Sequence, residues 1–442
     1  MRGIEAALKI LGTNGDFQKS EKFATERLRK LASDEKMKSQ DISLASSLIY
    51  IVMRRRELWL KIATEFLKND FNELPKFVQE SILAGTGGLL ELRRFSTGVL
   101  VNGIVENLRA KKLVKYVSLV NAVLRNVNES GAHKLDLIKT SSKTDERAMY
   151  AGIPVWSIPA WLRTWNKQEL NQIFEFMLQS PESSLRVSPS ENIEELANKF
   201  GGEISKLSGA IHIKETVNPI ELEGFQDGKF TVQSESSILT ASIVRRFYDK
   251  NGLILDMCSG RGVKAGQILQ ENPDANLECW ELSEKRQKSA LNELTRLKVI
   301  NRANFKTGNA LELEPEQKPS FVILDSPCSC SGTWNRKPES KWRLSWENLD
   351  KLIFTQKKLL DRAVNLCAKG GYVLYITCSL LKQENENVIA EILSKYQDSC
   401  VEVSSLLKWQ QKPFRKGKPW GIYIMPETAW LDGFYSCLIL KK

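Results

Sequence analysis

Apolar residues recur at helical spacing through the first third of the chain. Between residues 1 and about 130 they return every three or four positions, which is the period of an amphipathic helix. The strand-like alternation of apolar and polar residues is absent from this region. We therefore predict a bundle of six or seven helices, with breaks at Asn69-Asp70, at Gly85–Gly88 and at Gly103. Examples of the helical spacing are Leu44, Leu48, Ile51 and Val52, followed by Leu58, Ile62 and Phe66.

The pattern changes between residues 153 and 224, where five prolines divide the chain into short segments. Helical and strand-like segments are mixed there, which is typical of a small α+β domain. We predict helices at 167–178 and 193–200, and strands at 184–187, near Ile204 and at 210–213.

From Lys229 onward, short apolar runs alternate with amphipathic helical segments. This alternation predicts a parallel sheet with helices on both faces, and ligands bind such sheets beyond the carboxyl ends of the strands. The predicted strands are 253–257, 277–280, 321–324 and 372–376, and the predicted helices are 263–269, 283–297, 346–367 and 384–396. The predicted domains are therefore a helical bundle (1–150), an α+β linker (151–228) and an α/β domain (229–442).

Composition and length agree with a multidomain globular protein of 442 residues. No apolar run approaches the length of a membrane span, and Glu5 and Lys9 interrupt the apolar N-terminal run, which argues against a signal peptide. Eight scattered cysteines do not form a disulfide scaffold. We expect a cytoplasmic protein with reduced thiols, and no feature requires more than a monomer.

The positive charge of the chain is concentrated in the helical region. Residues 1–150 contain 26 basic and 18 acidic residues, a net charge of +8, whereas the other 292 residues carry +3. The basic clusters are Arg54–Arg56, Arg93-Arg94 and Arg109–Lys115. A basic module beside a near-neutral one suggests that the first binds a polyanion, although a solvated basic surface would have the same composition.

The first predicted strand of the α/β domain leads into a glycine loop, Asp256–Ala265. Its Gly260-x-Gly262-x-x-Ala265 pattern lets a nucleotide-like ligand approach the backbone and the helix N-terminus. The second strand ends at Glu281, where an acidic side chain would accept the hydroxyls of a ribose. These two features predict an adenosine site, but they leave a nicotinamide cofactor and S-adenosylmethionine as alternatives.

The next two strands each end in a cysteine. One is followed by Asp325-Ser326-Pro327-Cys328-Ser329 and the other by Thr377-Cys378-Ser379. Adjacent parallel strands would bring both thiols to the edge of the adenosine site, and hydride transfer needs no such pair. We predict no metal site, because Cys328-x-Cys330 lacks the usual zinc spacing and the only two histidines are distant. The other cysteines, Cys279, Cys367, Cys400 and Cys437, are interpreted as buried filler.

These segments resemble the Sun-type RNA cytosine-5 methyltransferases, in particular the RsmB group that modifies 16S rRNA. That family combines Asp-x-Cys-Ala-Ala-Pro-Gly-Gly-Lys, Asp-Ala-Pro-Cys-Ser and Thr-Cys-Ser, which correspond to Asp256–Lys264, Asp325–Ser329 and Thr377–Ser379. The resemblance extends over nearly the whole chain. Further matching segments are Val232-Gln233, Lys337–Trp342, Glu384-Asn385 and Asp432–Phe434, and Leu119–Arg125 is similar to the end of the family's NusB-like RNA-binding domain.

The resemblance implies a NusB-like bundle, a small α+β linker and a class I, Rossmann-like methyltransferase domain that uses S-adenosylmethionine. It implies transfer of a methyl group to carbon 5 of a cytosine in RNA, most simply 16S rRNA or a small-subunit precursor. The implied cofactor residues are Cys258, Ser259, Gly260, Arg261, Gly262, Val263, Lys264, Glu281, Asn309 and Asp325. The sequence departs from the family pattern at Ser234, Arg261, Val263, Glu281 and Asn309.

The chemistry gives each candidate catalytic residue a role. Carbon 5 of cytosine is a poor nucleophile until a thiolate adds to carbon 6, which is covalent catalysis. The resemblance assigns this attack to Cys378 and the release of the adduct to Cys328, whereas DNA cytosine-5 methyltransferases attack with the Pro-Cys cysteine. Asp325 can hydrogen-bond the N3 edge of the ring, and Lys264 would help to position cofactor and base.

The target base must leave its stack to reach these groups, and single-stranded RNA presents it at least cost. The basic and aromatic segment 408–420 could hold such a strand, or could be an exposed loop. Two other function classes remain open from the residues alone. One is a nicotinamide-dependent dehydrogenase, and the other is a non-catalytic RNA-binding or ribosome-assembly protein that kept the fold.

Overall fold

The computed structural model describes residues 2–12, 24–68, 70–92, 96–214, 218–249, 252–409 and 412–442. The predicted basic pair Arg93-Arg94 lies outside these residues, as does Asn69. The chain divides into two compact units: Met1–Pro159 with Lys337–Trp346, and Ala160–Arg336 with Glu347–Lys442. None of the described helices combines the length and apolar content that crossing a membrane requires.

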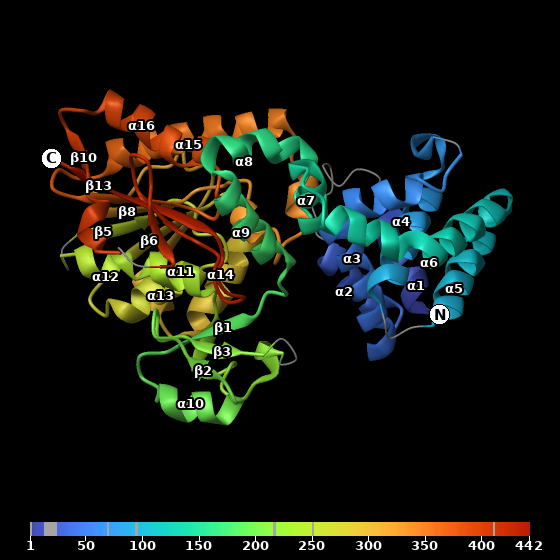
Figure 1. Ribbon diagram of the computed structural model, residues 1–442. Helices are drawn as coiled ribbons and strands as arrows, with labels where there is room; N and C mark the ends of the chain where they lie inside the picture. The colour runs from blue at the N-terminus through green and yellow to red at the C-terminus, as the bar shows by residue number, and fades with distance from the viewer. Residues whose placement is uncertain are drawn as a thin grey trace. The chain divides into compact units, whose positions relative to one another are not determined.

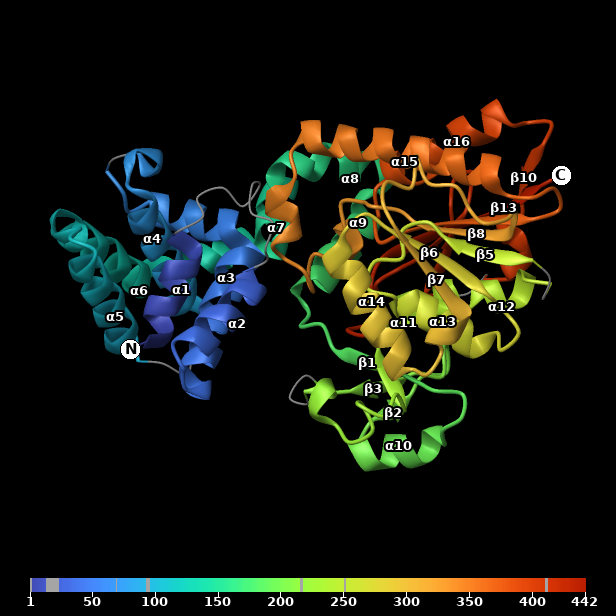
Figure 2. The ribbon, with the colours of Figure 1, turned by 180° about the vertical axis from the view of Figure 1, so that it is seen from behind.

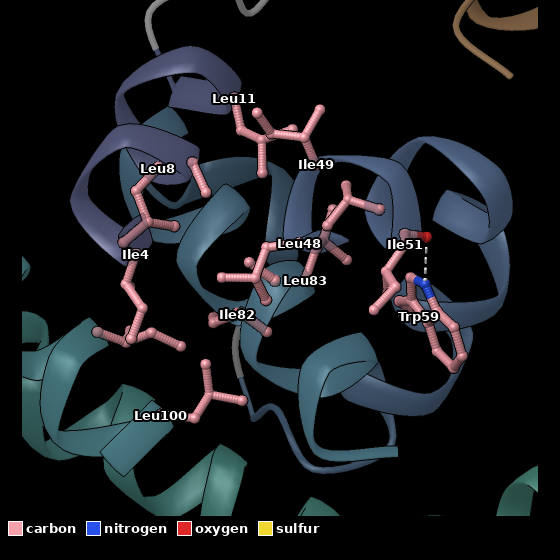
Figure 3. Packing of buried hydrophobic residues seen from close by; sticks show 14 of the residues in the cluster. Ile4, Leu8, Leu11, Leu48, Ile49, Ile51, Trp59, Ile82, Leu83 and Leu100 are labelled. Carbon is pink, nitrogen blue, oxygen red and sulfur yellow. Dashed lines mark hydrogen bonds between the residues drawn. The ribbon is translucent and has the colours of Figure 1, made fainter. Parts of the chain in front are cut away.

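The first unit is a helical bundle, as the apolar periodicity predicts (Figure 1). Its buried core joins Leu48 and Trp59 of one helix to Ile82 and Leu83 of another (Figure 3). The helices are α1 (Arg2–Gly12), α2 (Ala24–Asp34), α3 (Ser39–Thr64), α4 (Lys76–Glu91), α5 (Thr97–Ala110), α6 (Val117–Lys139) and α7 (Thr144–Ala151).

The predicted breaks at Gly85–Gly88 and Gly103 are wrong, because α4 and α5 continue through them. These glycines allow close packing between helices. A Cβ on Gly85 would lie 2.5 Å from Leu124 Cδ2, and one on Gly87 would lie 2.5 Å from Ile51 Cγ2. Tertiary packing therefore outweighs the low helix propensity of glycine here.

Helix α3 is kinked at Arg55, whose φ of −137° is not helical. The carbonyls on the preceding turn accept hydrogen bonds from side chains instead. Trp59 Nε1 donates to Ile51 O over 2.9 Å (Figure 3), and Lys341 Nζ donates to Arg54 O over 2.7 Å. Trp342 Nε1 donates to Met53 O over 2.5 Å. The segment Lys337–Trp346 thus belongs to the helical unit because it satisfies backbone groups that the kink exposes.

The second unit contains a small antiparallel sheet, with strands in the order β2-β3-β1-β4. The predicted helices of this region are confirmed at α9 (Lys167–Leu178) and α10 (Ile193–Phe200), and α8 spans Ile158–Thr164. The strands are β1 (Ser183–Val187), β2 (Glu203–Ile204), β3 (Ile211–Ile213) and β4 (Phe230–Val232).

The large sheet of this unit has the order β11-β12-β13-β9-β8-β5-β6-β7, and β10 pairs with β13. Helices α15 and α16 cover one face and α11 to α14 the other (Figures 1 and 2). The strands are β5 (Leu253–Asp256), β6 (Leu277–Glu281), β7 (Ala303–Thr307), β8 (Pro319–Asp325), β9 (Tyr372–Thr377), β10 (Cys400–Glu402), β11 (Phe414–Lys416), β12 (Ile422–Ile424) and β13 (Phe434–Lys441). The helices are α11 (Glu235–Ala241), α12 (Ile243–Phe247), α13 (Val263–Glu271), α14 (Glu284–Arg296), α15 (Trp346–Leu366) and α16 (Glu386–Lys395).

The predicted all-parallel sheet needs one correction. Strands β5 to β9 are parallel, but β13 runs antiparallel to β9 and extends the sheet with β10, β11 and β12. The sheet is therefore mixed, and the carboxyl ends of β5, β6, β7, β8 and β9 share one edge.

Candidate active site

The glycine loop connects β5 to α13. Cys258, Ser259, Gly260, Arg261 and Gly262 form the loop, and Val263 and Lys264 begin the helix. Gly260 and Gly262 have φ of +59° and +78°, the left-handed region that favours glycine. A Cβ on Gly262 would also lie 2.9 Å from the Cβ of Ala290 on α14. The loop thus depends on its two glycines.

Glu281 lies at the carboxyl end of β6, beside the loop, and is only 4% exposed. Its Oε2 accepts the backbone N–H of Gly260 over 3.0 Å, and its Oε1 accepts that of Ser283 over 2.9 Å. Asn309 follows the next strand, and the preceding residue, Gly308, donates its N–H to Glu281 O over 3.1 Å. The structure therefore brings together the two strand-end polar residues that the sequence predicts for the cofactor.

Three ionisable side chains lie close together at the same edge of the sheet: Lys264, Asp325 and Asp256. Lys264 Nζ lies 2.6 Å from Asp325 Oδ2. Burial opposes the charge of Lys264, but Asp325, Cys378 and Asp256 outweigh burial and raise its pKa. Burial and the neighbouring Asp325 raise the pKa of Asp256 to about 7. Its buried Oδ1 has no hydrogen-bond partner in the described part of the chain.

The two candidate catalytic cysteines meet at the ends of β8 and β9, which are neighbouring parallel strands. Cys328 Sγ lies 3.4 Å from Cys378 Sγ. Hydrogen bonds with Cys330 and Cys378, together with burial, raise the pKa of the Cys328 thiol. These surroundings favour the neutral form of the Cys328 thiol, and either sulfur can be the donor in its contact with Cys378. The sequence predicts this pairing because consecutive strand ends share an edge.

Cys330 joins this pair, although the sequence-based prediction places only Cys328 and Cys378 together. It has a left-handed φ of +57°, and its sulfur lies within 4.8 Å of those of Cys328 and Cys378, a spacing that a metal ion could bridge. The predicted absence of a metal site stays a prediction. The one signal for this third thiol in the sequence is the C-x-C spacing, which is shorter than the usual spacing of zinc ligands.

Glu384 links the two cysteine loops. From the sequence it is identified only as part of a segment that matches the family, and no role is assigned to it. Its buried carboxylate accepts the backbone N–H of Ser329 over 2.8 Å and the Ser329 hydroxyl over 2.5 Å. The same carboxylate accepts the Ser379 hydroxyl over 2.5 Å and Gln356 Nε2 over 2.9 Å. Ser329 and Ser379 each follow a candidate catalytic cysteine, so one carboxylate holds both loops in register. Burial raises the pKa of Glu384 despite these hydrogen bonds.

Two family models match this chain. Residues 248–440 match 16S rRNA methyltransferase RsmB/F, and residues 5–129 match the NusB family. The chain is 24% identical over 460 aligned residues to the probable ribosomal RNA small subunit methyltransferase B of Bacillus subtilis, covering 99% of this chain and 98% of that protein. It is 29% identical to ribosomal RNA small subunit methyltransferase B of Proteus mirabilis, covering 77% and 76%.

Solved structures share the fold. The crystal structure of PH0851 aligns over 100% of this chain and 98% of its own, with a TM-score of 0.79 and 20% identity. A methyltransferase homologue from Pyrococcus horikoshii aligns over 68% of this chain and 100% of its own, with a TM-score of 0.57 and 19% identity. At this identity the comparison establishes the fold alone, and it confirms the predicted multidomain architecture with a Rossmann-like domain.

Proposed function

Because residues 248–440 match the 16S rRNA methyltransferase RsmB/F family and residues 5–129 match the NusB family, we propose that the chain methylates carbon 5 of a cytosine in 16S rRNA. The observation that carries this proposal is the 3.4 Å approach of the Cys328 and Cys378 thiols at the ends of neighbouring strands. Methylation of nitrogen or oxygen atoms, which are already nucleophilic, would not need such a pair.

The residues around the glycine loop fit S-adenosylmethionine. Each Glu281 oxygen accepts one backbone N–H, and a carboxylate oxygen has room for a second donor, so the group can also accept two ribose hydroxyls. The unpartnered Asp256 Oδ1 offers a further acceptor. When bound, the cofactor would supply an electrophilic methyl group on a sulfonium. Lys264, Asn309, Asp325 and the loop 258–263 complete the proposed binding set.

The reaction follows from the two thiols and the charged pair beside them. The Cys378 thiolate adds to carbon 6, and negative charge develops at N3. Lys264, 2.6 Å from Asp325, can pass a proton to this carboxylate, which then donates a hydrogen bond to the N3 edge. Carbon 5 then has the electron density to accept the methyl group. A base then takes the carbon 5 proton, the electron pair of that bond restores the carbon 5–carbon 6 double bond, and Cys378 leaves as thiolate. The resemblance assigns assistance in this release to Cys328. The choice of Cys378 as the nucleophile follows the family resemblance, because either sulfur can donate in the Cys328–Cys378 contact.

Denaturing gels with labelled 16S rRNA and S-adenosylmethionine test these roles. Cys378→Ala should lose methyl transfer and form no covalent RNA complex. Cys328→Ala should accumulate a denaturation-resistant complex, and the double variant should lose it. Cys400→Ser is the matched control, because Cys400 is a buried cysteine on β10. A trapped complex in Cys378→Ala but not in Cys328→Ala would reverse the roles, and failure to bind the cofactor in calorimetry would favour a non-catalytic RNA-binding protein.

The helical unit would supply RNA affinity through its net charge of +8 over residues 1–150. A deletion of residues 1–150 would also remove Arg54 O and Met53 O, which accept hydrogen bonds from Lys341 and Trp342. Charge substitution is therefore the better test. Changing the exposed Lys111, Lys112 and Lys115 to Gln should weaken RNA binding and lower its salt dependence, with cofactor affinity kept. Unchanged RNA affinity would contradict an RNA-binding role for this cluster.

A further inference from the structure

A basic pocket of about 160 Å³ lies in the second unit. The end of α8, the turn after β9 and the β11–β12 hairpin form its walls. This volume corresponds to roughly five water molecules at about 30 Å³ each, which is room for a phosphate group and its closest waters.

One wall of the pocket belongs to the loop that carries the proposed nucleophile. Lys382 follows Cys378 by four residues, and its backbone N–H donates to Thr164 Oγ1 over 3.0 Å. Trp165 Nε1 donates to Leu380 O over 2.8 Å, a buried hydrogen bond. These contacts fix the pocket relative to the Cys378 loop.

The pocket is strongly positive. Five cationic side chains line it, and Glu386 is the one carboxylate among its lining residues. That carboxylate is engaged, because it accepts the Tyr423 hydroxyl over 3.1 Å and the backbone N–H of Lys418. Four of the cations form no ion pair with any described residue. These four are Arg163, Lys382, Lys416 and Lys418.

The fifth cation, Arg415, is held in a fixed orientation. Its guanidinium lies 4.4 Å from the centroid of the Trp165 ring and pairs with Glu169 over 2.7 Å. Trp165 in turn packs edge-on against Tyr423, with ring centroids 5.1 Å apart. A guanidinium fixed by stacking loses little conformational freedom on binding an anion, and arginine suits phosphate oxygens in particular.

We propose that this pocket binds a backbone phosphodiester of the substrate RNA, close to the nucleotide whose base reaches Cys378. The inference rests on the proposed function, since it assumes an RNA substrate. A base that leaves its stack needs its own backbone held, and phosphate contacts set register without reading sequence. Because the pocket and the Cys378 loop share a wall, a phosphate bound in the pocket would position the RNA relative to the Cys378 thiol.

The test uses the full chain with Arg163, Lys416 and Lys418 changed together to Gln. All three side chains are exposed, so the fold should be kept, and thermal unfolding verifies this. Lys369→Gln is the matched control. Lys369 is also exposed and lies before β9, at the opposite end of that strand from Cys378. Fluorescence anisotropy with a labelled single-stranded 16S rRNA fragment measures Kd over a range of salt concentrations.

The triple variant should bind RNA about ten-fold more weakly than the control. Its salt slope should fall by about 0.7 for each phosphate that the pocket no longer neutralises, while cofactor affinity persists. Inorganic phosphate, at matched ionic strength, should compete with RNA in the wild type and not in the triple variant. Kd and slope equal to the control would overturn the proposal, as would phosphate binding without any change in RNA affinity. Wild-type protein that never methylates RNA would instead contradict the proposed function.

Discussion

The variant Asp256→Asn tests whether a buried carboxyl group at the end of β5, beside the proposed cofactor site, destabilises the folded protein. Asp256 is 2% exposed, and burial beside Asp325 raises its pKa from 3.8 to about 7. One pKa unit corresponds to about 1.4 kcal/mol. Ionised Asp256 therefore costs the folded state about 4 kcal/mol above neutral pH.

The sign of the pH dependence follows from where each state ionises. Below pH 3.8 the carboxyl is protonated in both states, and the cost is absent. Between this value and about 7 the unfolded chain releases the proton while the folded chain keeps it, so wild-type stability falls as pH rises. The amide of Asn does not titrate. The variant should gain about 4 kcal/mol relative to wild type over this window.

Urea unfolding of the full chain, following the transition of the second unit, measures this gain at pH values from about 4 to 9. An amide nitrogen at the unpartnered Oδ1 position costs about 1–3 kcal/mol at every pH. The ionisation of Asp256 is therefore measured only by how the difference in free energy of unfolding between variant and wild type changes with pH. A difference that stays constant with pH, or that favours wild type as pH rises, would refute the reasoning.

Three further predictions concern the cofactor, the cysteine loops and the helical unit. Glu281→Ala should raise the Kd for S-adenosylmethionine about ten-fold or more, because two hydroxyls lose a charged acceptor; calorimetry that returns the wild-type Kd would contradict the assigned role. Glu384→Gln should slow single-turnover methyl transfer about ten- to a hundred-fold with cofactor affinity kept. Glu391→Gln, on an exposed part of α16, is its control, and equal rates in the two variants would exclude a positioning role. Gly85→Ala should lower the free energy of unfolding by about 1 kcal/mol, since a clash of about 1–3 kcal/mol exceeds a helix-propensity gain of about 1 kcal/mol. Gly98→Ala, with no atom within 4 Å of the added Cβ, should instead stabilise, and equal changes at both glycines in urea unfolding would show that packing does not decide the outcome.

The segment Lys337–Trp346 is hydrogen-bonded to the helical unit because α3 is kinked at Arg55. A regular helix would have satisfied the carbonyls of Met53 and Arg54 internally. The kink at Arg55 exposes them, and Lys341 and Trp342 become their donors. The resemblance of this segment to the family does not indicate its partner, because the donors and acceptors lie more than 280 residues apart.

The sequence by itself indicated most of the long helices and the strands β5, β6, β8 and β9, since these depend on the local period of apolar residues. It did not indicate β7 or β10 to β13. It also determined that Cys328, Cys378 and Glu281 follow strands, and parallel strand ends share one edge. Only the tertiary structure decided the antiparallel strand β13 beside β9, the helices that continue through Gly85 and Gly103, and the Glu384 hydrogen bonds between the cysteine loops. Those features arise from contacts between segments far apart in the chain, and the packing of these segments outweighs local propensity. The local pattern of apolar residues does not reveal such contacts.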